Sequence, residues 1–556
     1  MSGRALPPNY NAGSFGSHSR LNRSPKGLFE GLKGLLPALA PAALGGSLPI
    51  LFIPISVDAY VLPRTVLVIA GGAGAAVAGL WLPAERRGPL GILLLPALAV
   101  AGAALIAMLA STSPVLSLVG SYSRYESLPV RLSYLLLFCL AAWLLRAPAQ
   151  RRLVLSFFLA GCLIAALEAV YQALAGFPAR PDGNLGHSNL LGSLLAMGIP
   201  VAAARSLRSG RWVLVLLGLA AGLAVSGSRS GWLGALAGCA LLLPLSARSP
   251  RSRRLLLAGA GVALALAAVL LVLSPLGSLH NDTGAARVHV WLDSLPMLAA
   301  RPLAGWGLDS QGLVLGRYLT GDWEPGVSFD RLHELDLDLL ATQGLLGLAA
   351  CAWFWGAWAL GCWRAWTESP ALRTAGEELP GLLGAGAGYL LVTSLNFDWA
   401  PATGPAWLLA GVAWSALPKR APLRRLSAPR VARVVGTMGA LLAAFFLAAL
   451  PQAADLAYFR GDLRSAVSLD PLQAQYHRAL GEQLLTAGQM QAGAGELELA
   501  SGLGEYDSQV FVELGDAYRA SGERRAALRA YRRALELNRF DSSARRRLAA
   551  YSSSSS

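Results

Sequence analysis

The sequence has few charged residues and few cysteines. Charged residues make up 14% of its 556 residues, against roughly a quarter in an average soluble protein. This shortage, together with 54% hydrophobic residues, excludes a soluble globular enzyme and a disordered chain. The five cysteines show neither metal-ligand spacing nor a disulfide framework, which excludes a secreted disulfide scaffold. With a mean hydropathy of +0.48, the chain is expected to be a multi-pass membrane protein.

Long apolar stretches recur along most of the chain, and about 20 helical residues are needed to cross a bilayer. They predict an all-α, polytopic fold of 12 to 13 transmembrane helices. The stretches at 212–226 and 231–247 are also compatible with a single re-entrant pair. The thirteen predicted spans are 35–57, 65–82, 89–110, 130–145, 153–175, 188–204, 212–226, 231–247, 255–275, 338–362, 379–397, 404–417 and 434–451.

The net charge of +15 is divided unequally between the loops. One set of alternate loops, with the N-terminal tail, holds 25 Lys and Arg against 5 Asp and Glu, whereas the other set holds 9 against 13. Basic loops stay in the cytoplasm. We therefore expect a cytoplasmic N-terminus and place the loops 111–129, 176–187 and 276–337 outside. The odd number of spans places the C-terminal segment outside too, and the basic charge does not indicate binding of nucleic acid.

The C-terminal segment has a different composition and resembles the tetratricopeptide repeat. Leu480-Gly481 and Leu514-Gly515 are 34 residues apart, which is the period of that repeat. Such helix pairs stack into a concave surface that binds a protein partner; the alternative is a plain helical cap. The predicted domains are a cytoplasmic tail (1–34), a transmembrane domain (35–451) with a long periplasmic loop (276–337), helical repeats (453–550) and a disordered tail (551–556).

Several polar residues of the outward loops could bind a phosphate group or transfer a proton beside it. A guanidinium binds phosphate oxygens through a planar fork and stays charged, and a histidine exchanges a proton near neutral pH. Together they indicate displacement of a lipid pyrophosphate by a hydroxyl group. The spacing of His280, His289, Asp282 and Asp293 matches no metal site, so we expect no metal. The candidate site residues are Arg124, His187, Asn189, Arg229, Arg287, Arg301 and His333.

Four blocks of the sequence resemble the bacterial O-antigen ligase and O-antigen polymerase (Wzy-type) superfamily, and the resemblance covers about residues 45–420. The most specific block has His333, Glu334, nine further residues and then GLLG. Ligases have Asn, Ser or Gln at the second position, so Glu334 leaves the subfamily and the acceptor open. The blocks are GSYSRY at 120–125, GNLGHSNLLGSLLAMGIP at 183–200, SGSRSGWLGALAG at 226–238, and 287–347 with RPLAGWGLDS at 301–310.

The resemblance implies a GT-C-like membrane glycosyltransferase of the bacterial cytoplasmic (inner) membrane. Such proteins move a glycan from an undecaprenyl-pyrophosphate carrier to an acceptor hydroxyl at the outer face, with inversion and without a metal or other cofactor. By this resemblance His333 is the catalytic base or orients the acceptor, and Arg229, Arg287 and Arg124 bind the pyrophosphate. Further possible substrate contacts are Asn189, His187 and Arg301.

Three kinds of acceptor and two other classes of function stay open. Lipid A-core, a growing polysaccharide and a protein are all possible acceptors, because ligases, polymerases and protein O-oligosaccharyltransferases share these blocks. A transporter or flippase of lipid-linked glycans would also have many spans and outward arginines, but transporters often have repeated halves, which are not found here. A membrane-anchored repeat scaffold for polysaccharide export is the third class, and it would need far fewer than thirteen spans.

Overall fold

The computed structural model describes residues 33–83, 90–247, 284–321, 329–374, 378–418 and 429–553, together with a few isolated residues between these ranges. Every regular element in these ranges is a helix, which confirms the predicted all-α class. Within the described ranges, five helices are long and apolar enough to cross a membrane, as expected for a polytopic membrane protein. They are Val61–Trp81, Gly91–Leu109, Pro148–Ala175, Leu335–Glu368 and Arg430–Phe459, and shorter apolar helices are Leu128–Leu144, Gly210–Ser226 and Leu379–Thr393.

Helices overlap twelve of the thirteen predicted spans, and the remaining span, 255–275, lies almost entirely outside the described residues. Since several of these helices are too short to cross a bilayer by themselves, the number of crossings stays a prediction. The helices are α2 (Leu39–Ser47), α3 (Val61–Trp81), α4 (Leu94–Leu109), α6 (Leu128–Leu144), α7 (Pro148–Ala175), α8 (Ser188–Ser206), α9 (Val213–Ser226), α10 (Arg229–Ser246), α13 (Leu335–Glu368), α15 (Leu379–Thr393), α16 (Ala400–Ser415) and α17 (Arg430–Ala444).

Glycines bring α8, α10 and α15 into close contact in the bundle. A Cβ on Gly234 of α10 would lie 2.7 Å from the carbonyl oxygen of Gly388 in α15, and one on Gly238 would lie 2.6 Å from that of Gly384. A Cβ on Gly231 would come within 2.7 Å of the Gly192 backbone in α8. Small residues are the usual means by which membrane helices approach each other closely. The glycines of the 226–238 block therefore place the start of α10 beside the end of α15.

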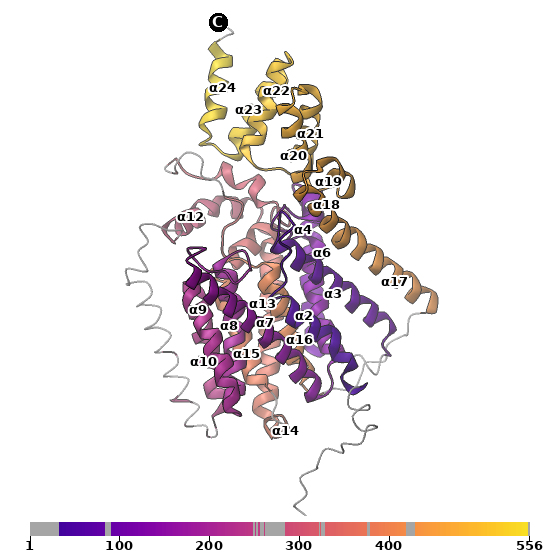
Figure 1. Cartoon of the computed structure of the whole chain (residues 1–556), viewed down its shortest axis with the longest axis vertical. Coiled ribbons are helices and arrows are strands. Elements are labelled where there is room, and N and C mark those ends of the chain that lie inside the picture. Colours follow the sequence, from indigo (N-terminus) through magenta and orange to yellow (C-terminus); the bar gives the residue numbers. More distant parts are fainter. Residues whose placement is uncertain are drawn as a thin grey trace, which may run out of the picture.

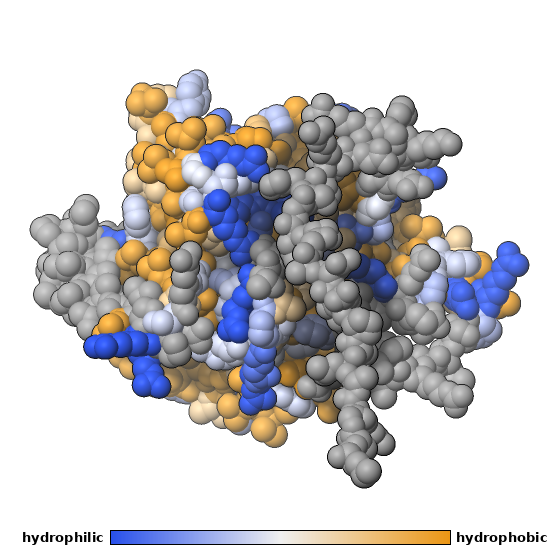
Figure 2. All heavy atoms as spheres, turned by 90° about the horizontal axis from the view of Figure 1, so that it is seen from below, coloured by the Kyte–Doolittle hydropathy of each residue, from blue (hydrophilic) through white to orange (hydrophobic). Residues whose placement is uncertain are grey.

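The described segment from α12 to the start of α13 and the C-terminal helices lie at one end of the bundle (Figure 1). They include α12 (Gly284–Ala300), which lies across this end, and two short 3₁₀ turns at Gln311–Leu313 and Leu315–Arg317. The short α5 (Pro114–Val119) follows α4. The opposite end is seen in Figure 2, where hydrophilic side chains lie among apolar ones. Arg373, in α14 (Pro370–Thr374), belongs to that end (Figure 1).

The C-terminal segment folds into helical hairpins whose turns contain glycine. Gly461, Gly488 and Gly522 have φ of 77°, 78° and 77°, a conformation that other residues adopt only with strain. α20 and α22 begin 34 residues apart, at Ala474 and Ser508, in agreement with the predicted period. Assignment to the tetratricopeptide family stays a prediction. The helices are α18 (Leu450–Phe459), α19 (Leu463–Leu469), α20 (Ala474–Thr486), α21 (Met490–Leu503), α22 (Ser508–Ala520), α23 (Arg524–Leu537) and α24 (Ser542–Ser553).

No break in the helix marks the predicted boundary between the transmembrane domain and the repeats. α17 continues through a π-helical stretch, Phe445–Ala449, directly into α18. A π-helical stretch interrupts the regular hydrogen-bond ladder without ending the helix. The division at residues 451 and 453 therefore stays a prediction, and one continuous helix links the bundle to the hairpins.

The hairpins pack firmly against the loops of the bundle. Leu116 of α5 joins the same apolar cluster as Leu497 and Val510 of the C-terminal segment. Asp455 of α18 is fully buried and accepts hydrogen bonds from the Ser56 and Tyr122 hydroxyl groups. A buried carboxylate is retained only where such donors surround it. The C-terminal segment therefore has a fixed position over the loops that carry the candidate site residues.

Candidate functional site

Candidate residues from distant parts of the chain meet at the loop 394–399, between α15 and α16. The ring of Phe397 lies edge-on to the rings of His333 and His187, at centroid distances of 5.3 and 6.3 Å. The guanidinium of Arg124 lies 5.5 Å from the Phe397 centroid and 4.3 Å from that of Trp399. Phe397 and Trp399 thus bring together three polar side chains that were candidates from the sequence.

The same loop holds two further candidates through its polar groups. Arg287 donates a hydrogen bond to the carbonyl oxygen of Leu395 (2.9 Å). The side chain of Asn189 donates to that of Asn396 (3.1 Å), and Asn396 in turn donates to the Ser230 hydroxyl (2.7 Å). The loop therefore connects the start of α8, the start of α10 and α12.

His333 lies in a tight turn just before α13. Its φ is +57°, a left-handed value that histidine adopts only occasionally. The turn is closed by Asp338, which accepts from the Leu332 amide (3.0 Å), and by Glu334, which caps the helix by accepting from the Leu337 amide (2.7 Å). Two carboxylates of the motif thus determine where the imidazole lies.

A kink in α13 explains the fixed spacing between His333 and the glycine of the motif. Gly344 has φ of 64° and ψ of −163° inside the helix. The backbone of residues 302–307 fits against this kink: Trp306 donates to the Ala341 carbonyl (2.8 Å) and Leu345 donates to the Pro302 carbonyl (2.7 Å). A Cβ on Gly344 would lie 2.3 Å from the Leu303 carbonyl, so only glycine fits without strain.

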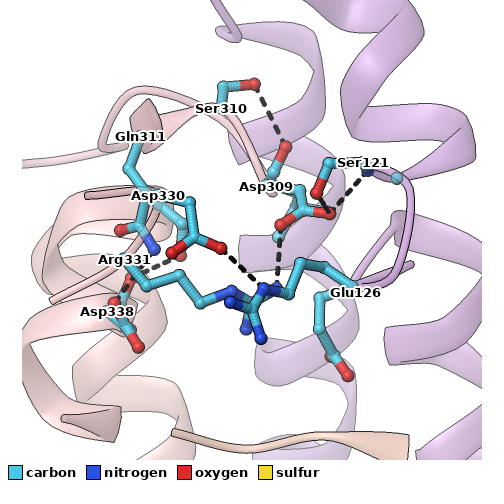
Figure 3. A network of polar contacts seen from close by, with 12 residues as sticks. Ser121, Glu126, Asp309, Ser310, Gln311, Asp330, Arg331 and Asp338 are labelled. Carbon is cyan, nitrogen blue, oxygen red and sulfur yellow. Dashed lines mark hydrogen bonds and ion pairs between the residues drawn. The ribbon is translucent and has the colours of Figure 1, made fainter. Parts of the chain in front are cut away.

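A network of buried charges holds the loop of Ser121 beside the turn that carries Asp330 and Arg331 (Figure 3). Arg331 is almost fully buried and pairs with Asp309 at 2.9 Å, and Asp309 accepts from both the amide and the hydroxyl of Ser121 (2.7 and 2.9 Å). Arg124 pairs with Asp330 at 2.6 Å. Since removing one partner of a buried pair is strongly destabilising, these residues fix the relative positions of the two loops.

Arg229 lies at the start of α10 with its side chain exposed, and its neighbour Ser230 is bound by Asn396. The turn before it is bound by Arg180, which donates to the Gly227 carbonyl (3.3 Å) and to Asn189 (3.2 Å). Among the described residues, no hydrogen bond or ion pair is found for the Arg229 guanidinium, so this cation is available to an anionic ligand.

Arg301 lies apart from the cluster. It donates to the carbonyl of Ala110 at the end of α4 (3.1 Å), and its guanidinium lies 4.4 Å from the Trp306 ring. These contacts hold the 302–307 segment against α4 rather than against the 394–399 loop. Its proposed role as a substrate contact has no support in this arrangement and stays a prediction.

The cluster keeps its histidines neutral. Burial and the charges of Arg124 and Arg287 lower the pKa of His333 to about 4, against the opposing effect of Asp330. Burial and the charges of Arg180, Arg124 and Arg287 also lower the pKa of His187. A neutral imidazole accepts a proton, and nearby guanidiniums attract an anion. Chemically, the arrangement can deprotonate a hydroxyl beside a bound polyanion.

Glu334 occupies the position at which ligases have an amide or hydroxyl residue. The pKa of its carboxyl group is also shifted. Burial raises the pKa of Glu334 to about 7, and the carboxylate of Asp336 acts in the same direction. The carboxyl group next to His333 is therefore partly protonated near neutral pH. In that form it resembles the neutral amide that the motif has at this position.

Metal binding has little support in these residues. Among the residues that the structure describes, no group of three or more His, Cys, Asp or Glu side chains could hold an ion. His289 and Asp293 approach within 3.5 Å, and His289 also contacts the Thr320 hydroxyl. His280 and Asp282 lie outside the described residues. The expectation of a metal-free reaction stays a prediction.

Several residues of this arrangement were not among the candidates predicted from the sequence: Asn396, Phe397, Trp399, Arg180 and Asp330. The predicted span 379–397 extended over the loop, whereas α15 ends at Thr393. The polar residues in the segment SLNFDW, between two apolar stretches, were the available signal for a loop at the membrane surface. The pairing of Asp330 with Arg124 had no sequence signal, because the two are more than 200 residues apart.

Part of the chain matches a known protein family. Residues 213–352 match the family model described as O-antigen ligase. The matched range contains Arg229, Arg287 and His333, but not Arg124, the 394–399 loop or the C-terminal hairpins. A search of curated proteins found no match. The match confirms the resemblance to the O-antigen ligase superfamily within residues 213–352, and the roles of the candidate site residues stay predictions.

Proposed function

We propose, from the O-antigen ligase domain that this chain carries at residues 213–352, that the protein transfers a glycan from an undecaprenyl-pyrophosphate carrier to an acceptor hydroxyl. The O-antigen ligase family comprises membrane glycan ligases and polymerases. The finer proposal concerns the carrier, the inverting and metal-free reaction, and the residues that perform it. The reaction takes place at the outer face of the bacterial cytoplasmic membrane.

One observation carries the proposal: the meeting of separate sequence blocks at the 394–399 loop. His333, His187 and Arg124 pack on Phe397, while Arg287 and Asn189 bind the backbone and side chain of its neighbours. These residues come from distant parts of the chain and were chosen as candidates for one site. Their contacts with one loop support the proposal that they form that site. Of the seven candidates, these five contact the loop; Arg229 is linked to it only through its neighbour Ser230, and Arg301 lies apart.

The roles of the residues follow from charge and protonation. We assign the pyrophosphate to Arg287 and Arg229, with Arg124, which packs on Phe397, as a further cation. The acceptor oxygen attacks the sugar carbon as the bond from that carbon to the pyrophosphate oxygen breaks, and His333 takes the hydroxyl proton. The arginines stabilise the charge on the departing pyrophosphate, an effect worth several kcal/mol in a site that excludes water. Attack opposite the leaving group inverts the sugar carbon.

Binding of the donor would also make His333 a stronger base. The charges of Arg124 and Arg287 contribute to the low pKa of His333 in the empty site. A bound pyrophosphate compensates these charges, so the pKa of the imidazole rises when the donor is in place. His333 is therefore most basic while the donor is bound, which is when the acceptor hydroxyl must be deprotonated.

The distribution of charge supports the proposed orientation. The loops at the site end belong to the set with 9 basic and 13 acidic residues, which the positive-inside rule places outside. The C-terminal hairpins pack on these same loops. We therefore propose a cytoplasmic N-terminus and periplasmic repeats that recruit the acceptor or a partner protein. Lipid A-core, polysaccharide and protein remain the candidate acceptors.

A transfer assay separates this proposal from transport. The purified chain would be given undecaprenyl-pyrophosphate glycan and each class of acceptor, with and without EDTA. We expect a glycosylated acceptor and released carrier pyrophosphate, in equal amounts and unaffected by EDTA. If no acceptor is glycosylated and the protein instead moves the intact lipid-linked glycan across liposomes, the chain is a flippase. If it does neither, the scaffold function applies.

A further inference from the structure

Arg180 lies at the candidate site, although it was not a candidate from the sequence. It belongs to the loop 176–187, just before α8, and its side chain is exposed. One nitrogen of its guanidinium, Nη2, donates both to the side chain of Asn189 (3.2 Å) and to the Gly227 carbonyl (3.3 Å). The chain itself thus holds Arg180 between the start of α8 and the turn before α10.

The other donors of this guanidinium are unused. Among the described residues, no hydrogen bond is found for Nε or Nη1, and no ion pair for any nitrogen of Arg180. The nearest carboxylate in the sequence, Asp182, is bound instead by the Gln172 side chain (3.1 Å) and the Asn184 amide (2.9 Å). Nε and Nη1 of this exposed, anchored cation can therefore still donate to an anion.

Arg180 and Arg287 are attached to neighbouring residues of the loop between α15 and α16. Arg287 donates directly to the Leu395 carbonyl (2.9 Å). Arg180 is connected to the next residue, Asn396, through Asn189, whose amide donates to the Asn396 side chain (3.1 Å). The two guanidiniums thus approach this loop from different elements, Arg287 from α12 and Arg180 from the loop before α8.

A second cation, Arg229, is attached to the turn that Arg180 binds. Arg229 follows Gly227 by two residues, and a Cβ on Gly227 would lie 3.8 Å from the Arg180 Nε. Burial is the main cause of the low pKa of His187, and Arg180 comes first among the charges that lower it further. In the described part of the chain, neither Arg180 nor Arg229 has an ion-pair partner. Their mutual repulsion favours binding of an anion beside this turn.

These cations fit an anion with two phosphate groups better than an anion with one. Arg287 lies on α12, whereas Arg180 and Arg229 are attached to the turn before α10. A monophosphate has a single group of charged oxygens, whereas a pyrophosphate has two such groups joined by a bridging oxygen. One phosphate group can therefore bind on the side of Arg287 and the other on the side of Arg180. Hydrogen bonds from guanidinium to phosphate are about twice as strong as neutral ones.

We propose that Arg180 binds the second phosphate group of the lipid-linked donor and makes the site prefer a pyrophosphate carrier to a monophosphate carrier. Nη2 holds the side chain against Asn189 and Gly227, while Nε and Nη1 donate to the phosphate oxygens. The inference rests on the proposed function, because it concerns the leaving group of that reaction. It adds a residue that selects the class of carrier.

Binding of two carrier lipids to the full chain tests this inference. The protein would be placed in nanodiscs, and dissociation constants would be measured for undecaprenyl pyrophosphate and undecaprenyl phosphate, each with the same fluorescent group. We expect the wild type to bind the pyrophosphate more tightly. Arg180→Gln should weaken pyrophosphate binding about tenfold, the effect of one charge-assisted hydrogen bond, and monophosphate binding less than about threefold.

Two further variants keep the outcome decisive. Arg180→Lys keeps the charge and should lose less affinity for the pyrophosphate than Arg180→Gln. If Arg180→Gln does not fold, Arg180→Lys should still lower the preference for the pyrophosphate, because a single ammonium group cannot hold the turn and reach the phosphate as well. Arg529→Gln is the matched control, at an exposed arginine of α23 with no ion pair among the described residues, and should leave both constants unchanged.

Three results would contradict the inference, and one of them also concerns the proposed function. Equal losses for both lipids in Arg180→Gln would mean that Arg180 only holds the turn. A preference for the pyrophosphate that is absent from the wild type, or unchanged in a folded variant, would overturn the selective role of Arg180. A wild type that binds neither lipid would contradict the proposed function itself, and the inference with it.

Discussion

His333 is held in a conformation that its own side chain does not favour. A left-handed residue other than glycine costs about 1 kcal/mol, and such strain persists only where the surroundings determine it. Here the Asp338 and Glu334 carboxylates close the turn on either side of the imidazole. The strained backbone at His333 therefore reduces stability but holds the imidazole in one position.

The strain gives a stability prediction. His333→Gly should be more stable than His333→Ala by about 1 kcal/mol, because glycine adopts a φ of +57° without penalty and alanine does not. Thermal unfolding of the two purified variants would measure the difference. Equal melting temperatures would mean that the turn relaxes to another conformation when the imidazole is removed.

Glu334 should impose a pH dependence on the reaction. Its pKa is raised to about 7, so its carboxylate becomes ionised as the pH rises through that value. The added negative charge opposes binding of a pyrophosphate, and kcat/KM should therefore fall above pH 7. Glu334→Gln should abolish this fall, whereas the loss caused by protonation of His333 should appear only towards pH 4. A fall near pH 7 that survives in Glu334→Gln would assign it to another group.

At the scale of elements, the 394–399 loop organises the site without belonging to any recognised block. Phe397 is the common neighbour of His333, His187 and Arg124. Aromatic and cation–π contacts of this kind are worth about 0.5–1.5 kcal/mol each. We therefore regard Phe397 as a positioning residue, which acts through the groups it orients.

Replacing Phe397 tests this role. Phe397→Leu should lower kcat about tenfold to a hundredfold with a smaller effect on KM, because reacting groups lose orientation while the arginines that bind the donor remain. Phe354→Leu is the matched control: that ring is fully buried against Phe138 and Trp407 in the bundle. It should lower the melting temperature and leave kcat nearly unchanged. An equal loss of kcat in both variants would reduce Phe397 to a packing residue.

The sequence predicted helices better than it predicted their ends. Apolar composition located twelve described helices, because hydropathy reports burial in lipid or protein directly. It failed at residues 394–397, where a short polar loop adjoins an apolar run, and α15 ends at Thr393. The spacing between His333 and Gly344 was visible as a pattern, but its cause, a kink that receives residues 302–307, depends on contacts between segments far apart in the chain.

For the candidate site, too, the sequence predicted which residues take part but not how they are arranged. The sequence selected His333, Arg124 and Arg287 by their chemistry, and the structure brings them together. It could not exclude Arg301, whose partners are the Ala110 carbonyl and the Trp306 ring. Ion pairs such as that of Arg124 with Asp330 had no local signal, since only the folded loops bring the two side chains within 2.6 Å.

At the scale of the whole molecule, the candidate site and the hairpins share one end. α18 binds the loops next to α3 through Asp455, and the cluster around Leu116 joins the later hairpins to α5. A partner or acceptor held by the hairpins would therefore be presented directly above the site (Figure 1). With the site at the outer face, as proposed, the C-terminus would lie on the outer side of the membrane as well.

The position of the C-terminus can be measured directly. Alkaline phosphatase fused after Ser556 should be active in cells, because the enzyme folds only outside the cytoplasm and the predicted number of spans is odd. A fusion after Arg208, in a predicted cytoplasmic loop, is the matched control and should be inactive. An inactive C-terminal fusion would mean an even number of crossings and would place the hairpins on the cytoplasmic side.

In the proposed reaction, His333 takes the proton of the acceptor hydroxyl at a site where arginines hold the donor. The most direct test of this step is the turnover of purified His333→Ala with the lipid-linked glycan and an acceptor. His289→Ala, on the same face but away from the 394–399 loop, is the matched control. We predict that kcat falls by about 10²–10⁴ in His333→Ala, the usual contribution of a general base, and stays within a few-fold of the wild type in His289→Ala. Wild-type turnover in a folded His333→Ala protein would show that His333 is not the base.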